Sequence, residues 1–297
     1  MAELGGGVYH VIVTIAADII PRDLRFGIDQ HADRAWFGDD MMLSALLDSF
    51  AVLLPEGERY FIKALRSALP AVTDPEVRAG IQGYAVQEAF HTREHESYND
   101  AMRALGHNVD EMEARVAAAL AATKGLPSRV VVTCAIEHLT YTFSHFFLSR
   151  PEQLARMKPA YRRLWAWHAL EELEHSGVAL QVVRDVTGHY SPVKRYLFRV
   201  MALNIVIVRL GRLVLTNLIA IMARNGRPMR MRDWLRLLWL EIGPFGIGRV
   251  GLLYYAAYMI PGFRGLPARD ARMIEAGRRL LEQYTDESAV PAAPLAA

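Results

Sequence analysis

Four long segments with helical periodicity, each opened by a proline, constrain the fold of this chain more than any other feature. They cover residues 55–69, 75–105, 127–148 and 151–186 of the 297. Proline is tolerated at the first position of a helix because an N–H group there would have no partner within the helix. The lengths of these segments and their short connections are typical of a four-helix bundle. We therefore expect an all-α protein with a bundle over residues 55–187.

The flanking segments predict additional elements around this bundle. Residues 8–20 are apolar and β-branched, which predicts a strand or hairpin in an N-terminal extension over 1–54. Residues 40–53 predict a lead-in helix, and the alanine-rich segment 107–125 a short helix or a crossover. The tail 288–297, rich in alanine and proline, is expected to be disordered.

Composition limits the chemistry that this chain can support. Apolar residues make up 52% and charged residues 22% of it, which excludes an intrinsically disordered chain. A single cysteine, Cys134, excludes a disulfide framework and any cysteine-rich zinc or iron–sulfur site. We expect this thiol to be buried and inert. Any metal site must therefore use histidine and carboxylate ligands.

Basic charge is concentrated in the segment 193–240, which holds ten Lys or Arg residues and one acidic residue. Such asymmetry indicates an anionic partner, and the absence of a nucleic-acid reader motif favours a membrane surface or an acyl carrier over nucleic acid. The apolar run 201–223 contains Arg209 and Arg212, which would be costly inside a bilayer. We expect residues 188–287 to form amphipathic helices packed on the bundle, with a helix lying on a membrane as the second interpretation and a true span as the third. A homodimer stays open.

The start of the chain also bears on location. Its first residues carry no basic cluster, and the early apolar run lacks a cleavage-like ending, so the sequence does not predict a signal peptide. We expect a cytoplasmic protein, with peripheral membrane association as the alternative.

The motif Glu-x-x-His occurs on two of the predicted bundle helices, as Glu88/His91 and Glu172/His175. Residues three apart lie on one helix face, so each pair can reach the same metal. Two such helices, with one glutamate from each of the other two, supply the ligand set of ferritin-like di-iron and di-manganese proteins. The remaining two helices offer Glu58 and Glu137. The sequence therefore predicts a ferritin-like bundle that holds two divalent ions, iron first and manganese or zinc as alternatives.

Further polar residues surround these motifs. His95 and His168 lie seven residues from Glu88 and His175 respectively, on the same helix faces, and are candidates for ligands, for hydrogen-bond donors to ligands, or for histidines of the core. Other side chains are expected beside the ligands rather than on the metal: Gln87, Tyr141, Glu171 and Glu174.

Four blocks of the sequence together resemble the bacterial family of predicted metal-dependent hydrolases. They are Leu54-Pro55-x-Gly57-Glu58-x-x-Phe61, Gln87-Glu88-Ala89-x-His91-x-x-x-His95-x-x-x-Asn99, Glu137-His138-x-Thr140 and Trp167-His168-Ala169-x-Glu171-Glu172-x-Glu174-His175-x-x-Val178-Ala179. The resemblance covers about residues 20–260 and implies a metal enzyme more strongly than it implies hydrolysis. The chain departs from the family at Leu180-Gln181, where members carry an aromatic residue and an acid.

Three functions fit these motifs. The first is an oxygen-activating di-iron enzyme that oxidises a small apolar substrate, with a pocket lined by Phe143, Phe146 and Phe147. The second is a hydrolase, in which one or two metals activate water; here His91-x-x-Glu94-His95 also matches the pattern of inverted zinc peptidases. The third is a metal-binding protein without catalysis.

Overall fold

The computed structural model describes residues 19–175, 177–243, 246–265 and 267–289 of the chain. Within these ranges the chain forms twelve α-helices and no strand, and the expected all-α class is confirmed. One isolated β-bridge joins Phe37 to Met157. The strand predicted over 8–20 falls mostly outside the described residues, and the two that are described, Ile19 and Ile20, have no regular secondary structure.

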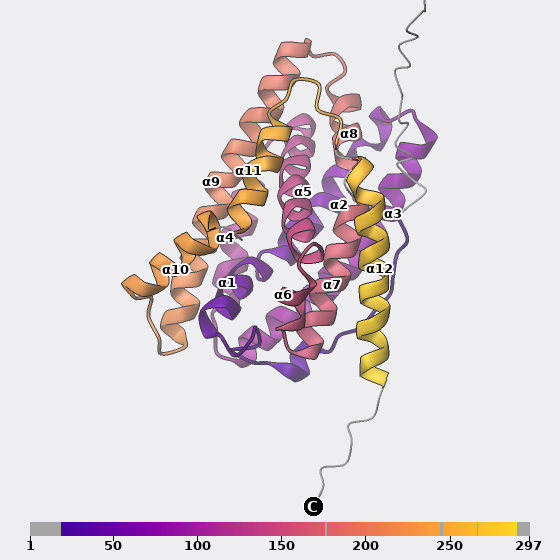
Figure 1. Cartoon of the computed structure of the whole chain (residues 1–297). Coiled ribbons are helices and arrows are strands. Elements are labelled where there is room, and N and C mark those ends of the chain that lie inside the picture. Colours follow the sequence, from indigo (N-terminus) through magenta and orange to yellow (C-terminus); the bar gives the residue numbers. More distant parts are fainter. Residues whose placement is uncertain (1–18, 176, 244–245, 266, 290–297) are drawn as a thin grey trace, which may run out of the picture.

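The centre of the molecule is built from helices in the predicted bundle region (Figure 1). Helix α2 packs along α3, and α5 packs along both α7 and α8, with further contacts between α2 and α5. Proline occupies the first turn of each long bundle helix. The sequence predicted these prolines for α2, α3 and α5, whereas α7 begins at Pro159 and not at Pro151. The bounds are α2 Leu54–Ala68, α3 Pro75–Ala104, α5 Leu126–Leu148, α7 Pro159–Glu174 and α8 Val178–Val186.

The segment 151–186 is not the single helix that we expected, because it divides into α6 (Pro151–Ala155), α7 and α8. Lys158 is extended, with ψ at 149°, because the ring of the following proline disfavours the helical conformation. The second break lies after Glu174, where His175 takes the C-cap position of α7. His175 therefore projects from a helix end rather than from a continuous helix.

Two shorter helices confirm the expected flanking elements. Helix α1 (Met41–Ala51) is the lead-in helix, and its N-cap residue Asp40 accepts hydrogen bonds from the backbone N–H groups of Met42 and Leu43. Helix α4 (Val109–Ala121) follows Asn108, whose side chain caps it in the same manner.

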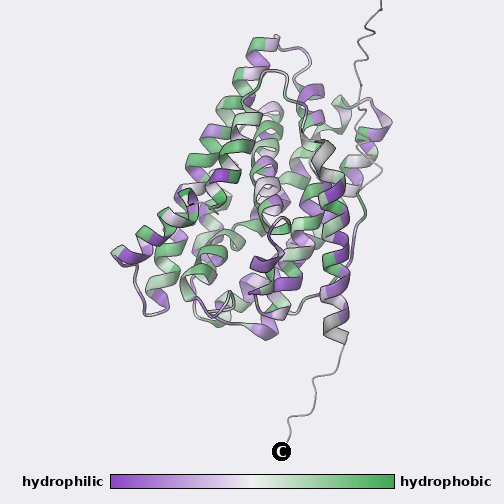
Figure 2. Cartoon of the chain, viewed as in Figure 1, coloured by the Kyte–Doolittle hydropathy of each residue, from purple (hydrophilic) through white to green (hydrophobic). Residues whose placement is uncertain are grey.

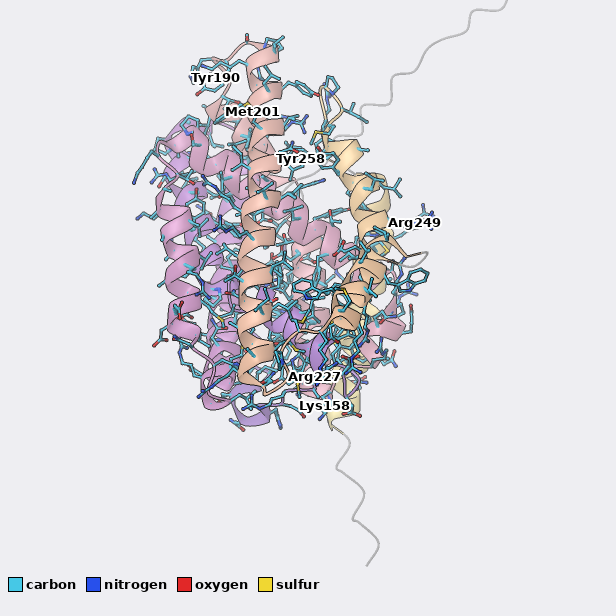
Figure 3. All side chains as sticks on the ribbon, turned by 90° about the vertical axis from the view of Figure 1, so that its left-hand side faces the viewer. Lys158, Tyr190, Met201, Arg227, Arg249 and Tyr258 are labelled. Carbon is cyan, nitrogen blue, oxygen red and sulfur yellow. The ribbon has the colours of Figure 1, made fainter. Side chains whose placement is uncertain are left out.

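The C-terminal third adds four helices, which cover two sides of the bundle (Figures 1 and 3). Helix α9 packs on α1 and α5, α11 packs on α5, and α12 packs on α7. Helix α12 includes Ser288 and Ala289, so the chain is helical two residues into the predicted tail; the rest of that tail lies outside the described residues. The bounds are α9 Pro192–Arg224, α10 Met231–Ile242, α11 Ile247–Tyr258 and α12 Pro267–Ala289.

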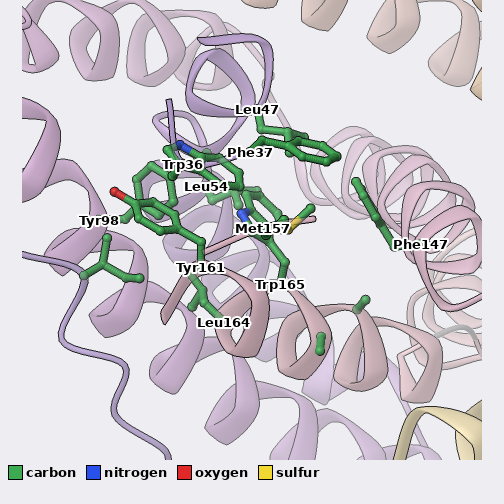
Figure 4. Packing of buried hydrophobic residues seen from close by; sticks show 14 of the residues in the cluster. Trp36, Phe37, Leu47, Leu54, Tyr98, Phe147, Met157, Tyr161, Leu164 and Trp165 are labelled. Carbon is green, nitrogen blue, oxygen red and sulfur yellow. The ribbon is translucent and has the colours of Figure 1, made fainter. Parts of the chain in front are cut away.

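An aromatic cluster joins the segment before α1 to α3 and α7 (Figure 4). Trp36 stacks on Tyr161 with ring centroids 4.4 Å apart, and Tyr98 meets the edges of both rings. The indole of Trp36 and the phenol of Tyr98 donate to Asp48 at 2.9 and 2.6 Å. This packing fixes α3 against α7, and these two helices carry most of the candidate metal-binding histidines and glutamates named above.

Helices α9, α10 and α11 expose a broad apolar face on one side of the molecule (Figure 2). Helix α9 is long and apolar enough to cross a membrane by length and composition, although Arg209 and Arg212 are exposed along it. Core helices of soluble proteins can have the same length and composition, so these two properties alone do not distinguish a membrane span from a packed helix. The large exposed side chains include Met201, Val208, Leu235, Leu238, Trp239, Leu252 and Leu253.

Candidate metal centre

The bundle brings together all the glutamates and histidines that we singled out as ligands or near-ligands. Each is at most 6% exposed, so a cluster of eight ionisable side chains lies within the protein interior. Helix α2 supplies Glu58, and α5 supplies Glu137. Helix α3 supplies Glu88, His91 and His95, and α7 with its C-cap supplies His168, Glu172 and His175.

The two Glu-x-x-His pairs face each other across the centre of this cluster. Nδ1 of His175 lies 3.2 Å from Oε1 of Glu88, 3.6 Å from Oε2 of Glu137 and 3.7 Å from Oε1 of Glu172. Nδ1 of His91 lies 3.6 Å from Oε1 of Glu172 and 3.7 Å from Oε2 of Glu88. Two ligands about 2.1 Å from one ion, at right or tetrahedral angles, lie about 3.0–3.4 Å apart. The observed spacings are close to those of donors that converge on metal ions.

The other two histidines extend the cluster. Nε2 of His95 lies 3.7 Å from Oε1 of Glu58 and 3.3 Å from Nδ1 of His168, whose Nε2 is 3.7 Å from Oε1 of Glu172. Four sets of three residues each have donor atoms within 4.8 Å of one another, and they share members. The eight residues therefore form one continuous cluster.

Several polar atoms of this cluster are buried without hydrogen-bond partners among the described residues. They include both carboxylate oxygens of Glu58 and of Glu88, together with Nδ1 of His91 and of His175. Leaving such a group unpaired costs about 1–3 kcal/mol, and more when it is charged. Metal ions placed among these donors would satisfy them, and nitrogen with carboxylate oxygen is a donor set that suits iron, manganese or zinc.

Burial and mutual repulsion raise the pKa values of two carboxyl groups in the cluster. Burial, together with the charge of Glu137, raises the pKa of Glu172 to about 8. Burial and the charge of Glu88 raise the pKa of Glu58 well above its usual value. Burial alone would lower the pKa of His91, but its bonds to Glu171 and Glu88 raise that pKa to about 10. Protons on histidine thus supply part of the positive charge that the four carboxylates require.

A ring of hydrogen bonds orients the two histidines of the Glu-x-x-His pairs. Nε2 of His91 lies 3.1 Å from Oε2 of Glu171, and Nε2 of His175 lies 2.9 Å from Oε1 of Gln87. The Gln87 amide nitrogen donates to Glu174 at 2.8 Å, which fixes the orientation of the amide. Both imidazoles therefore donate from Nε2 and present Nδ1 to the cluster, an arrangement that is usual for histidine ligands of metals.

The sequence did not identify Arg22 and Tyr84 as part of this outer ring. Arg22 donates to Glu171 at 3.1 Å and to Glu174 at 2.8 Å, from a segment about 150 residues away along the chain, so no local pattern marks it. Tyr84 donates to Oε1 of Glu137 at 2.5 Å. Tyr84 precedes Glu88 by four residues on α3, so the spacing on the helix face could have indicated it.

A small cavity of about 30 Å³ lies against the cluster. Glu137, His175 and the predicted neighbour Tyr141 line it, together with Cys134 and Tyr258 of α11. This volume accommodates one or two water molecules. Burial raises the pKa of Cys134 to about 11, which is consistent with the inert thiol that we expected.

The match to inverted zinc peptidases is not supported by the position of Glu94. Its Oε2 accepts the backbone N–H of Phe26 at 3.0 Å, and its Oε1 accepts from Arg93 at 2.8 Å. The carboxylate of Glu94 is therefore bonded to the segment around Phe26 and not to the glutamate–histidine cluster in which we expect the ions. A peptidase of that type needs this glutamate beside the metal as its general base.

The apolar pocket expected around three phenylalanines exists, with a volume of about 390 Å³. Phe143, Phe146 and Phe147 line it together with residues such as Val214 of α9 and Trp239 of α10. None of its described lining residues belongs to the glutamate–histidine cluster. The pocket thus does not deliver an apolar substrate directly to the cluster.

The fold and this cluster define a class: an all-α protein with a buried carboxylate–histidine centre suited to metal ions. Comparison with known families agrees, because the model of the family described as predicted metal-dependent hydrolase matches residues 20–267. The chain belongs to this family. Neither a curated protein nor a solved structure matches it. The family supports hydrolysis, which we weighed as the alternative, better than the oxidation that we placed first.

Proposed function

We propose that this protein is a metal-dependent hydrolase whose buried cluster holds two divalent ions and activates water. The observation that carries the proposal is the convergence of four glutamates and four histidines, many of whose donor atoms have no other described partner. Membership of the family of predicted metal-dependent hydrolases supports the reaction class. Bound divalent ions lower the pKa of water and polarise the bond under attack.

Charge balance supports two ions rather than one. Glu58, Glu88, Glu137 and Glu172 carry four negative charges when ionised, which two divalent cations neutralise with all histidines uncharged. Glu171 and Glu174 lie outside this count, because Arg22 and Arg278 are within 3.3 Å of them. A buried site that is neutral as a whole avoids the large cost of unpaired charge.

The chain's own residues would hold the ligands and shape the space for water. Glu137 and His175 are the two cluster members that line the small cavity, so we place the attacked bond there. Tyr84 fixes Glu137, and Gln87 fixes His175, so both face the cavity with little freedom. His138 lines the same cavity and donates from Nε2 to the carbonyl of Tyr254 at 3.0 Å, which holds its ring in the wall.

Metal counting and hydrolysis assays test this proposal together. The protein is stripped with a chelator and reloaded with zinc, manganese or ferrous iron. We expect about two ions per chain and hydrolysis of activated carboxylic or phosphoric esters that depends on the reloaded metal. His175→Ala should lose both, whereas His189→Ala should lose neither, because His189 is exposed and outside the cluster. Metal binding without any hydrolysis would favour the non-catalytic interpretation.

Oxidation is the competing reaction for a dinuclear site of this composition. The discriminating measurement is anaerobic loading with ferrous iron, followed by exposure to O2 and recording of the optical spectrum. A hydrolase should give metal-dependent ester cleavage under anaerobic conditions as well. Rapid oxygen-dependent spectral change, with no hydrolysis by any metal form, would contradict the proposed reaction.

We also propose that the apolar face of α9–α11 rests on an anionic membrane surface. The face combines exposed Leu235, Leu238 and Trp239 with exposed cations such as Arg209 and Arg232, a combination typical of interfacial helices. In flotation assays we expect the protein to bind phosphatidylglycerol vesicles and to bind phosphatidylcholine vesicles poorly. The double variant Leu235→Glu, Leu238→Glu should abolish binding. Equal binding to both kinds of vesicle would show that the exposed cations do not contribute to membrane binding.

A further inference from the structure

A second cavity, of about 390 Å³, lies next to the small cavity beside the cluster. Leu180 and Phe263 line both cavities, so the two share a wall. The lining of the second cavity is dominated by arginine: Arg184 of α8, Arg195 and Arg199 of α9, and Arg264 of the loop after α11. We refer to these four residues as the arginine pocket.

None of the four guanidinium groups has a carboxylate oxygen within 4.0 Å among the described residues. Backbone carbonyls hold three of them instead: Arg184 donates to Phe263 at 2.9 Å, Arg195 to Tyr190 at 3.4 Å, and Arg199 to Ile260 at 3.0 Å. A carbonyl oxygen positions a guanidinium without cancelling its charge. Burial, and next the charge of Arg264, lower the pKa of Arg184. The pocket therefore keeps a positive charge that the protein itself does not neutralise.

These four arginines differ from two other half-buried arginines of the chain. Arg22 and Arg227 are each paired with buried carboxylates. In the arginine pocket Arg199 is 6% exposed, and Nε of Arg195 is buried with no described hydrogen-bond partner. A concave site with converging, uncompensated guanidinium groups is suited to a tetrahedral oxyanion, because the planar fork of arginine matches two oxygens at once.

The start of α9 reinforces this charge. Pro192, the first residue of this 33-residue helix, also lines the pocket, and the N-terminus of a helix carries a partial positive charge. The partial charge at the N-terminus of α9 adds to the charge of the four arginines, and it would not form an anion-binding site without them.

We infer that the arginine pocket binds a phosphate-type oxyanion that belongs to the substrate of the neighbouring centre. That the bound compound is a substrate rests on the proposed hydrolase function, but the binding of the oxyanion does not require hydrolysis. Because the two cavities share Leu180 and Phe263, a molecule anchored by its oxyanion would extend toward Glu137 and His175. The substrate class is therefore an anionic, phosphate-bearing compound, either a soluble one or a lipid headgroup.

Direct binding of inorganic phosphate and pyrophosphate to the full chain tests this inference by isothermal titration calorimetry. Phosphate can also bind metal ions, so the titration is done before and after chelation of the metals. We expect saturable binding that survives metal removal and persists in His175→Ala. Binding no tighter than that of chloride, or binding that disappears with the metal, would overturn the assignment.

Matched variants locate the bound anion. Arg264→Gln removes an exposed cation of the pocket that makes no hydrogen bond to any other described residue, so it should leave the fold intact. Arg195→Gln is the second variant. Each should weaken pyrophosphate binding by tenfold or more. Arg209→Gln, an exposed arginine of α9 outside the pocket, should have no effect. Equal affinities for Arg264→Gln, Arg195→Gln and Arg209→Gln would show that the anion does not bind in this pocket.

Vesicles distinguish the two sources of the phosphate group. Tighter binding to phosphatidic acid vesicles than to phosphatidylglycerol vesicles, reduced by Arg264→Gln, would support a lipid headgroup. Competition of pyrophosphate for the pocket without any effect of Arg264→Gln on vesicle binding would support a soluble compound. If phosphate binds as expected but no hydrolysis is found with any metal, the pocket stands and the proposed hydrolase function fails.

Discussion

Gln87 and His175 form a hydrogen bond of 2.9 Å between the amide oxygen and Nε2 of the imidazole. The contact joins α3 to the C-cap of α7. It also orients the imidazole so that Nδ1 lies 3.2 Å from Oε1 of Glu88. The tautomer and the orientation of the His175 ring thus depend on the neutral amide of Gln87, which is not itself a candidate metal ligand. Gln87 is consequently a residue that positions a ligand.

Replacing Gln87 by Leu should weaken metal binding without unfolding the protein. Nε2 of His175 would lose its acceptor, so the imidazole would no longer be held with Nδ1 toward the cluster. Loss of such a partner typically reduces metal affinity 10–100-fold. Competition with a chelator of known affinity measures the change. Gln82→Leu on the exposed face of the same helix is the control, and a similar loss in that variant would contradict the assigned role.

Replacing Tyr84 by Phe should reduce metal affinity by a smaller factor, about tenfold. The change removes the 2.5 Å bond to Oε1 of Glu137 and leaves that buried oxygen without the phenol donor. The free energy of unfolding should fall by about 1 kcal/mol. Tyr60→Phe, which removes only a 3.5 Å contact to the carbonyl of Arg129, should leave metal affinity unchanged. Unaltered metal affinity in Tyr84→Phe would exclude a role for this bond.

Replacing Arg22 by Gln should destabilise the protein by roughly 3 kcal/mol, because buried Glu171 loses its arginine partner and buried Glu174 keeps only Arg278. Glu171 and Glu174 are both fully buried at their side chains, and Arg22 is only 17% exposed. Chemical denaturation measures the difference. Arg25→Gln, whose side chain is 60% exposed, should cost about 0–1 kcal/mol. Equal effects of the two substitutions would refute the structural importance of Arg22.

Asp48 should make stability depend on pH. Burial raises its pKa to about 7, above the value of about 3.9 in unfolded chains. The raised pKa favours the protonated native form, so this contribution is fully present below about pH 4 and is lost as the pH rises through 7. The slope is at most about 1.4 kcal/mol per pH unit in that window.

Asp48→Asn keeps an oxygen for Trp36 and Tyr98 but does not ionise. Between pH 4 and 7, the free energy of unfolding of the wild type should therefore fall relative to that of the variant. Urea unfolding at several pH values measures this difference, and a constant difference across the window would contradict the assignment.

Local sequence patterns were sufficient to predict three of the four bundle helices and the residues that cluster, but not the division of segment 151–186 into three helices. Proline at helix starts and the Glu-x-x-His spacing are properties of single helices, so no tertiary information was needed to place Glu88 beside His91. The meeting of α2, α3, α5 and α7 followed from the requirement that polar faces in apolar helices be buried together. The ligand role of each residue stays a prediction until metal is measured.

Features that depend on distant parts of the chain could not be predicted. The break after Glu174 puts His175 at a helix end, although the residues around it have helical periodicity. The contacts of Arg22 connect residues 149 and 152 positions apart, and the arginine pocket draws on two helices and a separate loop. Only the folded chain brings such residues together.

The segment from Ile20 to Phe26 lies across the outside of α3 and α7 and donates backbone N–H groups to Glu174, Glu171 and Glu94. Its partner Glu94 on α3 is 68 residues from Phe26, whereas its two partners on α7 are 149 and 154 residues away. Closing a longer loop costs more entropy, which slows the formation of such contacts. The two hydrogen bonds to α7 cannot form until α7 has been synthesised, so docking of this stretch is completed only after the growing chain has passed Glu174.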